Sequence, residues 1–267
     1  MMRDELWQRL LDRNVPDPTA GGDGLSPEEQ RALALYAPFA AEAFTVGHLG
    51  QSLDGFIATA AGRSHYVTGR ENIVHLHRLR ALADAVLVGA GTVAHDDPRL
   101  TVRHVAGRNP VRVVLDRRGA LSASHSIFTD GAAPTLWLHK GGAAPAAPSG
   151  VETVAMTEAD PAAILDLLAA RGLRRIFVEG GGRTVSAFLE AGCLDRLHVA
   201  VAPLIIGSGR PGIILPPVDD LADALRPPCR IFPMGRDVLF DCDLKPRSAG
   251  EQVAVPDNEA GPAGFDP

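Results

Sequence analysis

The residues Arg175-Ile176-Phe177-Val178-Glu179-Gly180-Gly181-Gly182-Arg183-Thr184 hold a strand, a glycine turn and the start of a helix. Residues 176–178 are a short apolar run that predicts a buried strand, and apolar side chains at helical spacing follow the glycines. Such a turn leaves backbone N–H groups free at the helix start, where small residues let a phosphate approach closely. A turn without any ligand is the alternative, so the rest of the chain has to decide.

Apolar runs of strand length alternate with helical patterns from about residue 43 to 244. Strands are expected near residues 45–49, 56–58, 84–89, 111–115, 135–138, 151–155, 197–202 and 238–244. A capping box of Thr68 and Glu71 predicts a helix to about Leu82, and Asp160-Pro161 opens another that Gly172 ends. Residues 90–92 are expected as a turn, and residues 96–103 as a loop. This alternation predicts a single α/β domain with a largely parallel sheet.

Both ends of the chain differ from this central part. Residues 2–13 and the segment that Ser26 caps predict two helices, so residues 1–42 are expected to form a helical extension. Residues 43–244 are the expected catalytic domain. From residue 245 on, large apolar side chains are scarce while glycine, proline and charge are frequent, which predicts a disordered tail over residues 245–267.

The composition excludes several classes of protein. The net charge of −6 argues against a nucleic-acid partner, because phosphate backbones select basic surfaces. No apolar run reaches the length of a membrane span, and the N-terminus lacks the apolar core of a signal peptide. The cysteines, 193, 229 and 242, are odd in number and lack C-x-x-C spacing, which indicates a reducing cytoplasm without a disulfide framework or zinc site. His75 and His77 have no third partner at ligand spacing, so no metal is expected.

Three predicted strand ends carry glycines or arginines, at residues 89–92, 116–118 and 179–182. In sheets of this kind, ligands bind beyond the carboxyl ends of the strands. Glycine turns at two ends suit the diphosphate of a dinucleotide. Arg117 or Arg118 at the third could pair with a 2′-phosphate, the group that separates NADP from NAD. The alternative for these arginines is a solvated surface turn.

Ser64, Arg80 and Arg103 form a second set, because a hydroxyl and two guanidinium groups suit a substrate phosphate. Taken singly, each is also compatible with a surface or helix-edge position. Glu179 at its strand end could orient a substrate amide or amine, or simply stabilise a helix N-terminus. Asp54 and Asp96 are the other candidate carboxylates, and Asp54 is expected to bond its own turn.

Eight segments together resemble the reductase domain of the bacterial riboflavin-biosynthesis deaminase/reductase, in the family's order from about residue 45 to 244. They are QSLDGFIA (51–58), GRSHYVT (62–68), HRLRA (77–81), VGAGTV (88–93), DDPRLTVR (96–103), PVRVVLD (110–116), EGG (179–181) and APLIIG (202–207). The resemblance implies a dihydrofolate-reductase-like fold, with a mixed, mostly parallel central sheet flanked by helices. It also implies NADPH as cofactor and a homodimer. The implied reaction is hydride transfer to C1′ of the ribosyl group of 5-amino-6-(5-phosphoribosylamino)uracil.

The same resemblance assigns site residues by motif. The implied substrate-binding positions are Ser64, Arg80, Leu100, Arg103 and Glu179, and the implied NADPH positions are Gly50, Tyr66, Thr92, Asp96, Gly181, Gly182, Arg183, Thr184, Val185, Ser186 and Ala187. Glu179 and Asp96 are the candidate catalytic carboxylates.

The sequence departs from the family at two positions and lacks one half of the bifunctional protein. His48 stands where the family often has Lys, and Tyr66 where it commonly has Trp. The zinc deaminase half is absent, since neither H-x-E nor P-C-x-x-C occurs. Two other functions stay open: a reductase of another small heterocycle such as a dihydropterin, and a non-catalytic NADP-binding protein.

Overall fold

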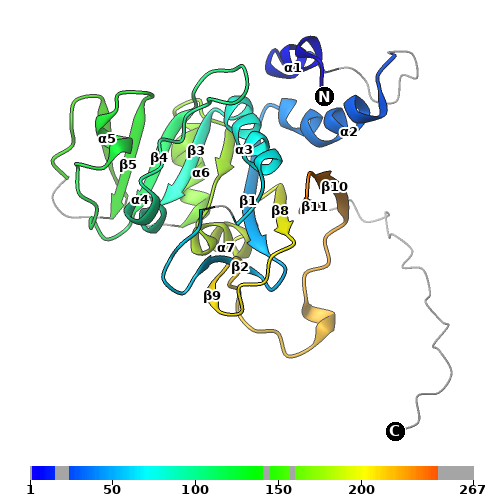
Figure 1. Ribbon diagram of the computed structural model, residues 1–267. Coiled ribbons are helices and arrows are strands. Elements are labelled where there is room, and N and C mark those ends of the chain that lie inside the picture. The colour runs from blue at the N-terminus through cyan, green and yellow to red at the C-terminus, as the bar shows by residue number, and fades with distance from the viewer. Residues whose placement is uncertain (1, 16–23, 66, 141–144, 157–159, 246–267) are drawn as a thin grey trace, which may run out of the picture.

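A computed structural model describes residues 2–15, 24–65, 67–140, 145–156 and 160–245 (Figure 1). Tyr66 and residues 246–267 of the expected tail lie outside these ranges. No helix within them is long and apolar enough to cross a membrane.

A nine-stranded sheet in the order β10-β11-β8-β1-β7-β3-β4-β5-β6 forms the centre of the molecule. Its strands are β1 Phe44–Ser52, β3 Ala85–Gly89, β4 Val111–Asp116, β5 Thr135–Lys140, β6 Val151–Met156, β7 Arg175–Val178, β8 Arg196–Ala202, β10 Cys229–Met234 and β11 Asp237–Asp243. Every neighbouring pair from β8 to β6 is parallel, whereas β11 runs antiparallel to β8 and to β10. The expected mixed, mostly parallel sheet is therefore confirmed.

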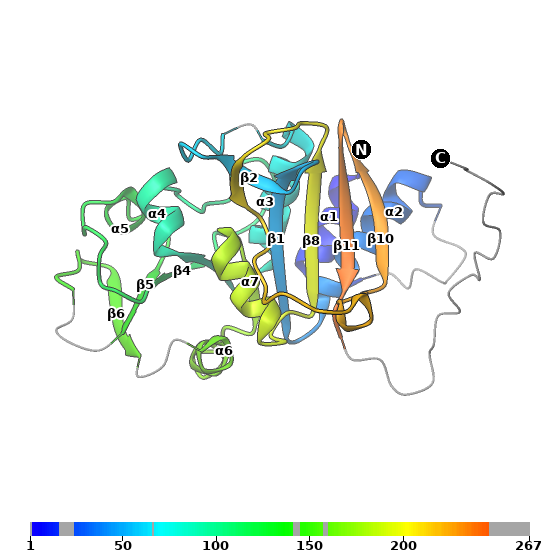
Figure 2. The same ribbon diagram turned by 90° about the horizontal axis from the view of Figure 1, so that it is seen from below.

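Helices cover both faces of the sheet (Figure 2). The helical elements are α1 Asp4–Leu11, α2 Pro27–Tyr36, η1 Ala37–Ala40, α3 Arg70–Leu82, α4 Ala90–Asp96, α5 Ser126–Thr129, α6 Pro161–Ala169, α7 Gly182–Glu190 and η2 Leu221–Asp223. Successive side chains of a strand point to opposite faces, and in β7 Phe177 packs with the α1–α3 core while Ile176 and Val178 pack with the α6–α7 core. Both faces are apolar, as expected of a parallel sheet.

The two N-terminal helices share a core with α3. Leu6, Trp7 and Leu10 of α1 are buried in that core, and the indole nitrogen of Trp7 donates a hydrogen bond of 2.8 Å to the Ala106 carbonyl. At the start of α2, the capping box of Ser26 and Glu29 is confirmed, and Glu29 also pairs with Arg3. The extension is therefore held to the sheet by buried apolar surface as well as by an ion pair.

The structure corrects two local predictions. Residues 90–96 form α4, where the sequence predicts a turn over residues 90–92. Asp97, with a left-handed φ of 39° before Pro98, ends the helix, and residues 97–103 are non-helical as expected. The helix α3 has Gly69 and not Thr68 at its N-cap, because the Gly69 N–H donates to Asp237 and the Thr68 hydroxyl accepts from Asn72 instead.

Two strands of the structure have no counterpart among the expected elements. The edge strand β10 carries a proline, which an edge strand tolerates and which obscures the pattern in the sequence. The second is β9, Gly209–Pro211, which pairs with β2, Phe56–Thr59, in a small separate sheet.

Candidate functional site

The carboxyl ends of β7, β3 and β4 lie side by side and open onto a cavity of about 800 Å³. These are the three strand ends on which the sequence places glycines or arginines. The cavity wall combines small residues of the α4 and α7 starts with the arginines that follow β4. Apolar side chains including Leu115, Ile164, Phe188 and Ile214 complete the wall. The surface is thus apolar with a few convergent polar groups, as in sites for small molecules.

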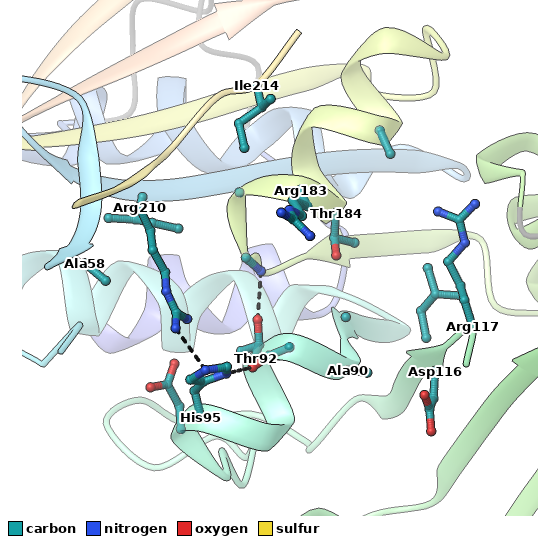
Figure 3. Close-up of a pocket in the computed structure, with 18 of the residues that line it drawn as sticks. Ala58, Ala90, Thr92, His95, Asp116, Arg117, Arg183, Thr184, Arg210 and Ile214 are labelled. Carbon is teal, nitrogen blue, oxygen red and sulfur yellow. Dashed lines mark hydrogen bonds between the residues drawn. The ribbon is translucent and has the colours of Figure 1, made fainter. Parts of the chain in front are cut away.

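The glycine turn after β7 brings backbone N–H groups to this cavity. Gly180 has a left-handed φ of 110°, which favours glycine, and the Gly181 N–H donates a 2.9 Å hydrogen bond to the Thr92 hydroxyl (Figure 3). The helix α7 then begins at Gly182 with no side chain capping it. A Cβ at Gly182 would collide with the carbonyls of Pro211 and Gly212, so the crossing backbone requires glycine here. The first turn of α7 therefore has backbone N–H groups without a side-chain cap, as helix starts that bind anions do.

A chain of hydrogen bonds fixes His95 and Arg210 at one side of the cavity (Figure 3). His95 Nδ1 lies 2.6 Å from the Gly91 carbonyl, which can only accept, so Nδ1 carries the proton. His95 Nε2 is then an acceptor for the Arg210 guanidinium at 2.9 Å. Nearby, the Ser64 hydroxyl donates a 3.0 Å bond to Asp96. Figure 3 shows Arg117 on the opposite side, beyond Thr184.

A second group of residues surrounds the carboxylate of Glu179, whose side chain is 11% exposed. Arg80 donates two hydrogen bonds to Glu179, one of them 2.6 Å long, and a third of 2.9 Å to the Thr101 carbonyl. Arg103 donates to the Thr101 hydroxyl at 2.7 Å. Partial burial and the charges of Arg80 and Arg99 lower the pKa of Arg103 from its usual value. Three arginines and one carboxylate leave this group with net positive charge.

Leu100, which directly precedes Thr101, has an unusual backbone conformation. It has a left-handed φ of 53° and its side chain is buried. A non-glycine residue with such a φ is uncommon and often marks a functional loop. The strained position directs the chain into Thr101, which both Arg80 and Arg103 contact.

The predicted site residues divide into three sets. Those that line the cavity are Ser64, Thr92, Asp96, Arg117, Gly181, Gly182, Arg183, Thr184 and Ala187. Arg80, Leu100, Arg103 and Glu179 belong to the second group outside the cavity wall. Gly50 is half-buried beside Thr68 and Asn72, and Val185 and Ser186 are buried, so these three do not line the cavity.

Sequence reasoning missed Arg210, His95 and Ile214 in the cavity wall. Residues 203–209 are conspicuous only as an apolar run that enters a glycine loop. The pairing of β9 with β2 brings the residues after that loop to the cavity, and pairing between such short, distant strands leaves no periodic signal. The sequence of the α4 helix, which carries His95, contains glycine and alanine and shows no helical pattern of large apolar residues.

His48 stands where the related family often has Lys, and it is buried. Its Nε2 lies 2.9 Å from the Asn72 side-chain oxygen. Burial, together with the nearby His198 and Arg80, lowers the pKa of His48 to about 3, so the imidazole is neutral near pH 7. No group of three His, Cys, Asp or Glu side chains within the described ranges is arranged to hold a metal ion.

Known proteins share the sequence and the fold of this chain. Residues 45–225 match the family model described as the RibD C-terminal domain. The chain is 33% identical over 219 residues to the 2,5-diamino-6-ribosylamino-4(3H)-pyrimidinone 5′-phosphate reductase of Methanothermobacter thermautotrophicus, covering 76% of this chain and 98% of that protein. It is 38% identical over 163 residues to the riboflavin biosynthesis protein RibD of Aquifex aeolicus, covering 60% of this chain and 46% of that protein.

A solved structure gives the same result for the fold. The Thermotoga maritima diaminohydroxyphosphoribosylaminopyrimidine deaminase/5-amino-6-(5-phosphoribosylamino)uracil reductase superposes with a TM-score of 0.66 at 29% identity. The match covers 81% of this chain and 61% of that one. The chain thus spans about half the length of the bifunctional relatives and nearly all of the archaeal one.

Proposed function

The chain belongs to the RibD C-terminal domain family, and on that premise we propose that it is the NADPH-dependent reductase of 5-amino-6-(5-phosphoribosylamino)uracil in riboflavin biosynthesis. The observation that carries the proposal is the pairing of two sites. A cavity with an uncapped helix start lies at the ends of β7, β3 and β4, and a net positive group surrounds Glu179, one residue before the glycine turn.

The cavity suits a dinucleotide. The free N–H groups of the first turn of α7 fit a diphosphate, and the apolar wall fits flat rings. The exposed Arg117 and Arg118 after β4 supply positive charge for a 2′-phosphate, which supports NADPH over NADH. When bound, the cofactor supplies the hydride; the protein contributes placement and charge.

The group around Glu179 suits a phosphorylated pyrimidine. Among the described residues the Arg103 guanidinium donates only to the Thr101 hydroxyl, so it is free to bind the phosphate. Arg80 holds the Glu179 carboxylate in one orientation, so that Glu179 accepts hydrogen bonds from the amino or ring N–H groups of the base. Asp96, oriented by Ser64, is the proposed proton donor, because transfer of a hydride to C1′ of the open-chain imine requires a proton at its nitrogen.

A second candidate substrate is 2,5-diamino-6-ribosylamino-4(3H)-pyrimidinone 5′-phosphate, which carries an amino group where the uracil has an oxygen. The match over 98% of the Methanothermobacter protein of that name favours it. Glu179 bears on the choice, because a carboxylate accepts hydrogen bonds and so prefers an amino group to a carbonyl at whichever ring position it faces.

Consumption of NADPH by the purified protein, followed by its absorbance, tests the proposal with both pyrimidines and with a dihydropterin. We expect oxidation with a ribosylamino-pyrimidine phosphate, and a higher kcat/KM for the uracil. Faster turnover of the diamino compound would assign the second substrate. Turnover of the dihydropterin alone would overturn the proposal, as would calorimetric binding of NADPH without oxidation on any candidate.

We further propose that the protein is a cytoplasmic homodimer. Several large apolar side chains are highly exposed, among them Leu53, Ile205, Leu221 and Ile231, between 61% and 74%. Exposed apolar patches rimmed by polar residues mark interaction surfaces. Light scattering coupled to size-exclusion chromatography should give twice the chain mass, and Ile231→Glu should shift it toward the monomer.

A further inference from the structure

Two cysteines oppose each other across the edge hairpin of β10 and β11. Cys229 pairs in register with Cys242, and their sulfur atoms lie 2.8 Å apart. The next pair outward, Pro228 and Asp243, is joined by a backbone hydrogen bond of 2.9 Å from the Asp243 N–H. Because hydrogen-bonded and non-hydrogen-bonded pairs alternate in an antiparallel ladder, Cys229 and Cys242 occupy a non-hydrogen-bonded pair.

This ladder position decides whether the two cysteines can be bonded. Cα atoms of non-hydrogen-bonded pairs are about 4.5 Å apart, at the short end of the range of about 4.4–6.8 Å that disulfides span. No backbone movement is therefore needed to join the sulfurs.

We propose that Cys229 and Cys242 form a reversible intramolecular disulfide that fastens the edge strand β10 to β11. Cys229 is exposed on β10, while Cys242 is buried against the core on the α7 side of the sheet. The remaining cysteine, Cys193, lies after α7, and among the described residues its thiol donates only to the Ala191 carbonyl. It therefore serves as an internal control.

The bond would form by exchange with a low-molecular-weight disulfide. The exposed Cys229 thiolate attacks one sulfur of the reagent, forming a mixed disulfide and releasing one thiol. Cys242 then loses its proton and attacks the Cys229 sulfur, releasing the second thiol. Two protein thiols are oxidised and one disulfide is reduced to two thiols, so no other reactant is needed.

The order of attack follows from the surroundings of the two sulfurs. Burial, followed by the hydrogen bond and charge interaction with Cys229, raises the pKa of Cys242 to about 12. Cys242 therefore stays protonated while the pair is reduced, and the accessible Cys229 reacts first. Once Cys229 is capped, it no longer disfavours the Cys242 thiolate, and the second attack is intramolecular.

The expected consequence is stability rather than a change in turnover. The bond closes the short loop of residues 230–241, which restricts the unfolded chain and should raise Tm by roughly 3–10 °C. Cys242 faces Leu197 in β8, whereas the cavity lies at the ends of β7, β3 and β4. NADPH oxidation should therefore be the same in both redox forms, which makes this proposal independent of the proposed function.

Intact-mass spectrometry tests the proposal on the full chain. The protein is equilibrated with reduced or oxidised glutathione and then alkylated under denaturing conditions. We expect three alkylated cysteines in the reduced form. In the oxidised form we expect one, Cys193, with a cross-linked peptide that joins Cys229 to Cys242. Cys193→Ser should retain the cross-link and the rise in Tm, whereas Cys229→Ser should lose both.

Other outcomes would overturn the proposal. They are three alkylated cysteines after oxidation, a mixed glutathione disulfide that persists on Cys229, and a Cys229 bond between two chains on a non-reducing gel. Because Cys229 lies on the surface, its replacement by serine leaves the core packing intact. Loss of the cross-link in Cys229→Ser therefore does not result from misfolding.

Discussion

Arg80 of α3 and Glu179 at the end of β7 form an ion pair with two hydrogen bonds, and both side chains are almost inaccessible to water, at 8% and 11%. The pair joins residues 99 positions apart and places the carboxylate directly before the glycine turn. Arg80 also donates a hydrogen bond to the Thr101 carbonyl. Arg80 therefore donates three hydrogen bonds to protein acceptors, whereas the Arg103 guanidinium donates only to the Thr101 hydroxyl among the described residues.

Removal of one member of this ion pair should lower the free energy of unfolding. Arg80→Ala leaves the Glu179 carboxylate buried without its partner, and we expect a loss of about 3–5 kcal/mol in the free energy of unfolding. The double variant with Glu179→Ala should lose less than the sum of the single changes, by about 0.5–3 kcal/mol. Urea unfolding measures all three. The exposed pair of Arg174 and Glu42 is the control, and additive losses at the buried pair would contradict its coupling.

Arg103→Ala should weaken binding of a phosphorylated substrate. Loss of one charge-assisted contact should raise KM by roughly 10-fold, with a smaller change in kcat. Steady-state kinetics at fixed NADPH measure the effect. Arg236→Ala, at the turn between β10 and β11, is the matched control. An unchanged KM would remove Arg103 from the substrate site.

Replacement of both Arg117 and Arg118 by Ala should reduce the preference for NADPH over NADH. The two arginines follow β4 in the cavity wall, and only NADPH carries the 2′-phosphate that they would pair with. We expect roughly a 10-fold rise in KM for NADPH and little change for NADH. Arg210→Ala on the opposite side provides the comparison, since it should affect both nucleotides alike. Equal losses in the double variant would place recognition of the 2′-phosphate elsewhere.

The buried His48 should make stability depend on pH. Its folded pKa of about 3 lies below its ordinary value of 6.5, so between these limits the unfolded chain binds a proton that the folded chain does not. Stability from this residue is therefore complete above pH 6.5 and is lost as the pH falls, by at most about 1.4 kcal/mol per pH unit. His48→Gln should reduce that slope in urea unfolding between about pH 4 and 6. His125→Gln is the control, and equal slopes in His48→Gln and the parent would contradict the burial effect.

Trp7→Ala tests whether the N-terminal helices contribute to the domain. The indole is 6% exposed and bonded to the Ala106 carbonyl, so its loss should cost about 3–5 kcal/mol of unfolding free energy. Gln8→Ala, on the exposed side of α1, should change little. Thermal unfolding measures both. A Trp7→Ala protein as stable as its parent would make the extension a detachable appendage.

Local patterns were sufficient where adjacent residues determine the structure. The apolar run at residues 176–178, the glycines after it and the capping box of Ser26 and Glu29 act within a few positions, and the strand, the α7 start and the Ser26 cap follow from them. The spaced motifs also placed Thr92, Asp96 and Gly181 at one site, because parallel strands bring their carboxyl ends to one edge.

Where distant segments meet, the sequence alone gave no answer. Arg210 reaches His95 because β9 pairs with β2, and Cys229 opposes Cys242 because β10 folds back on β11. No hydrophobic periodicity or residue spacing in the sequence indicates either contact. The chain by itself therefore determined the α/β class, the family and the edge of the sheet that carries the site. Only the tertiary structure decided that Arg80 is committed to Glu179 and which charges face the cavity, because those contacts depend on how remote strands are ordered in one sheet.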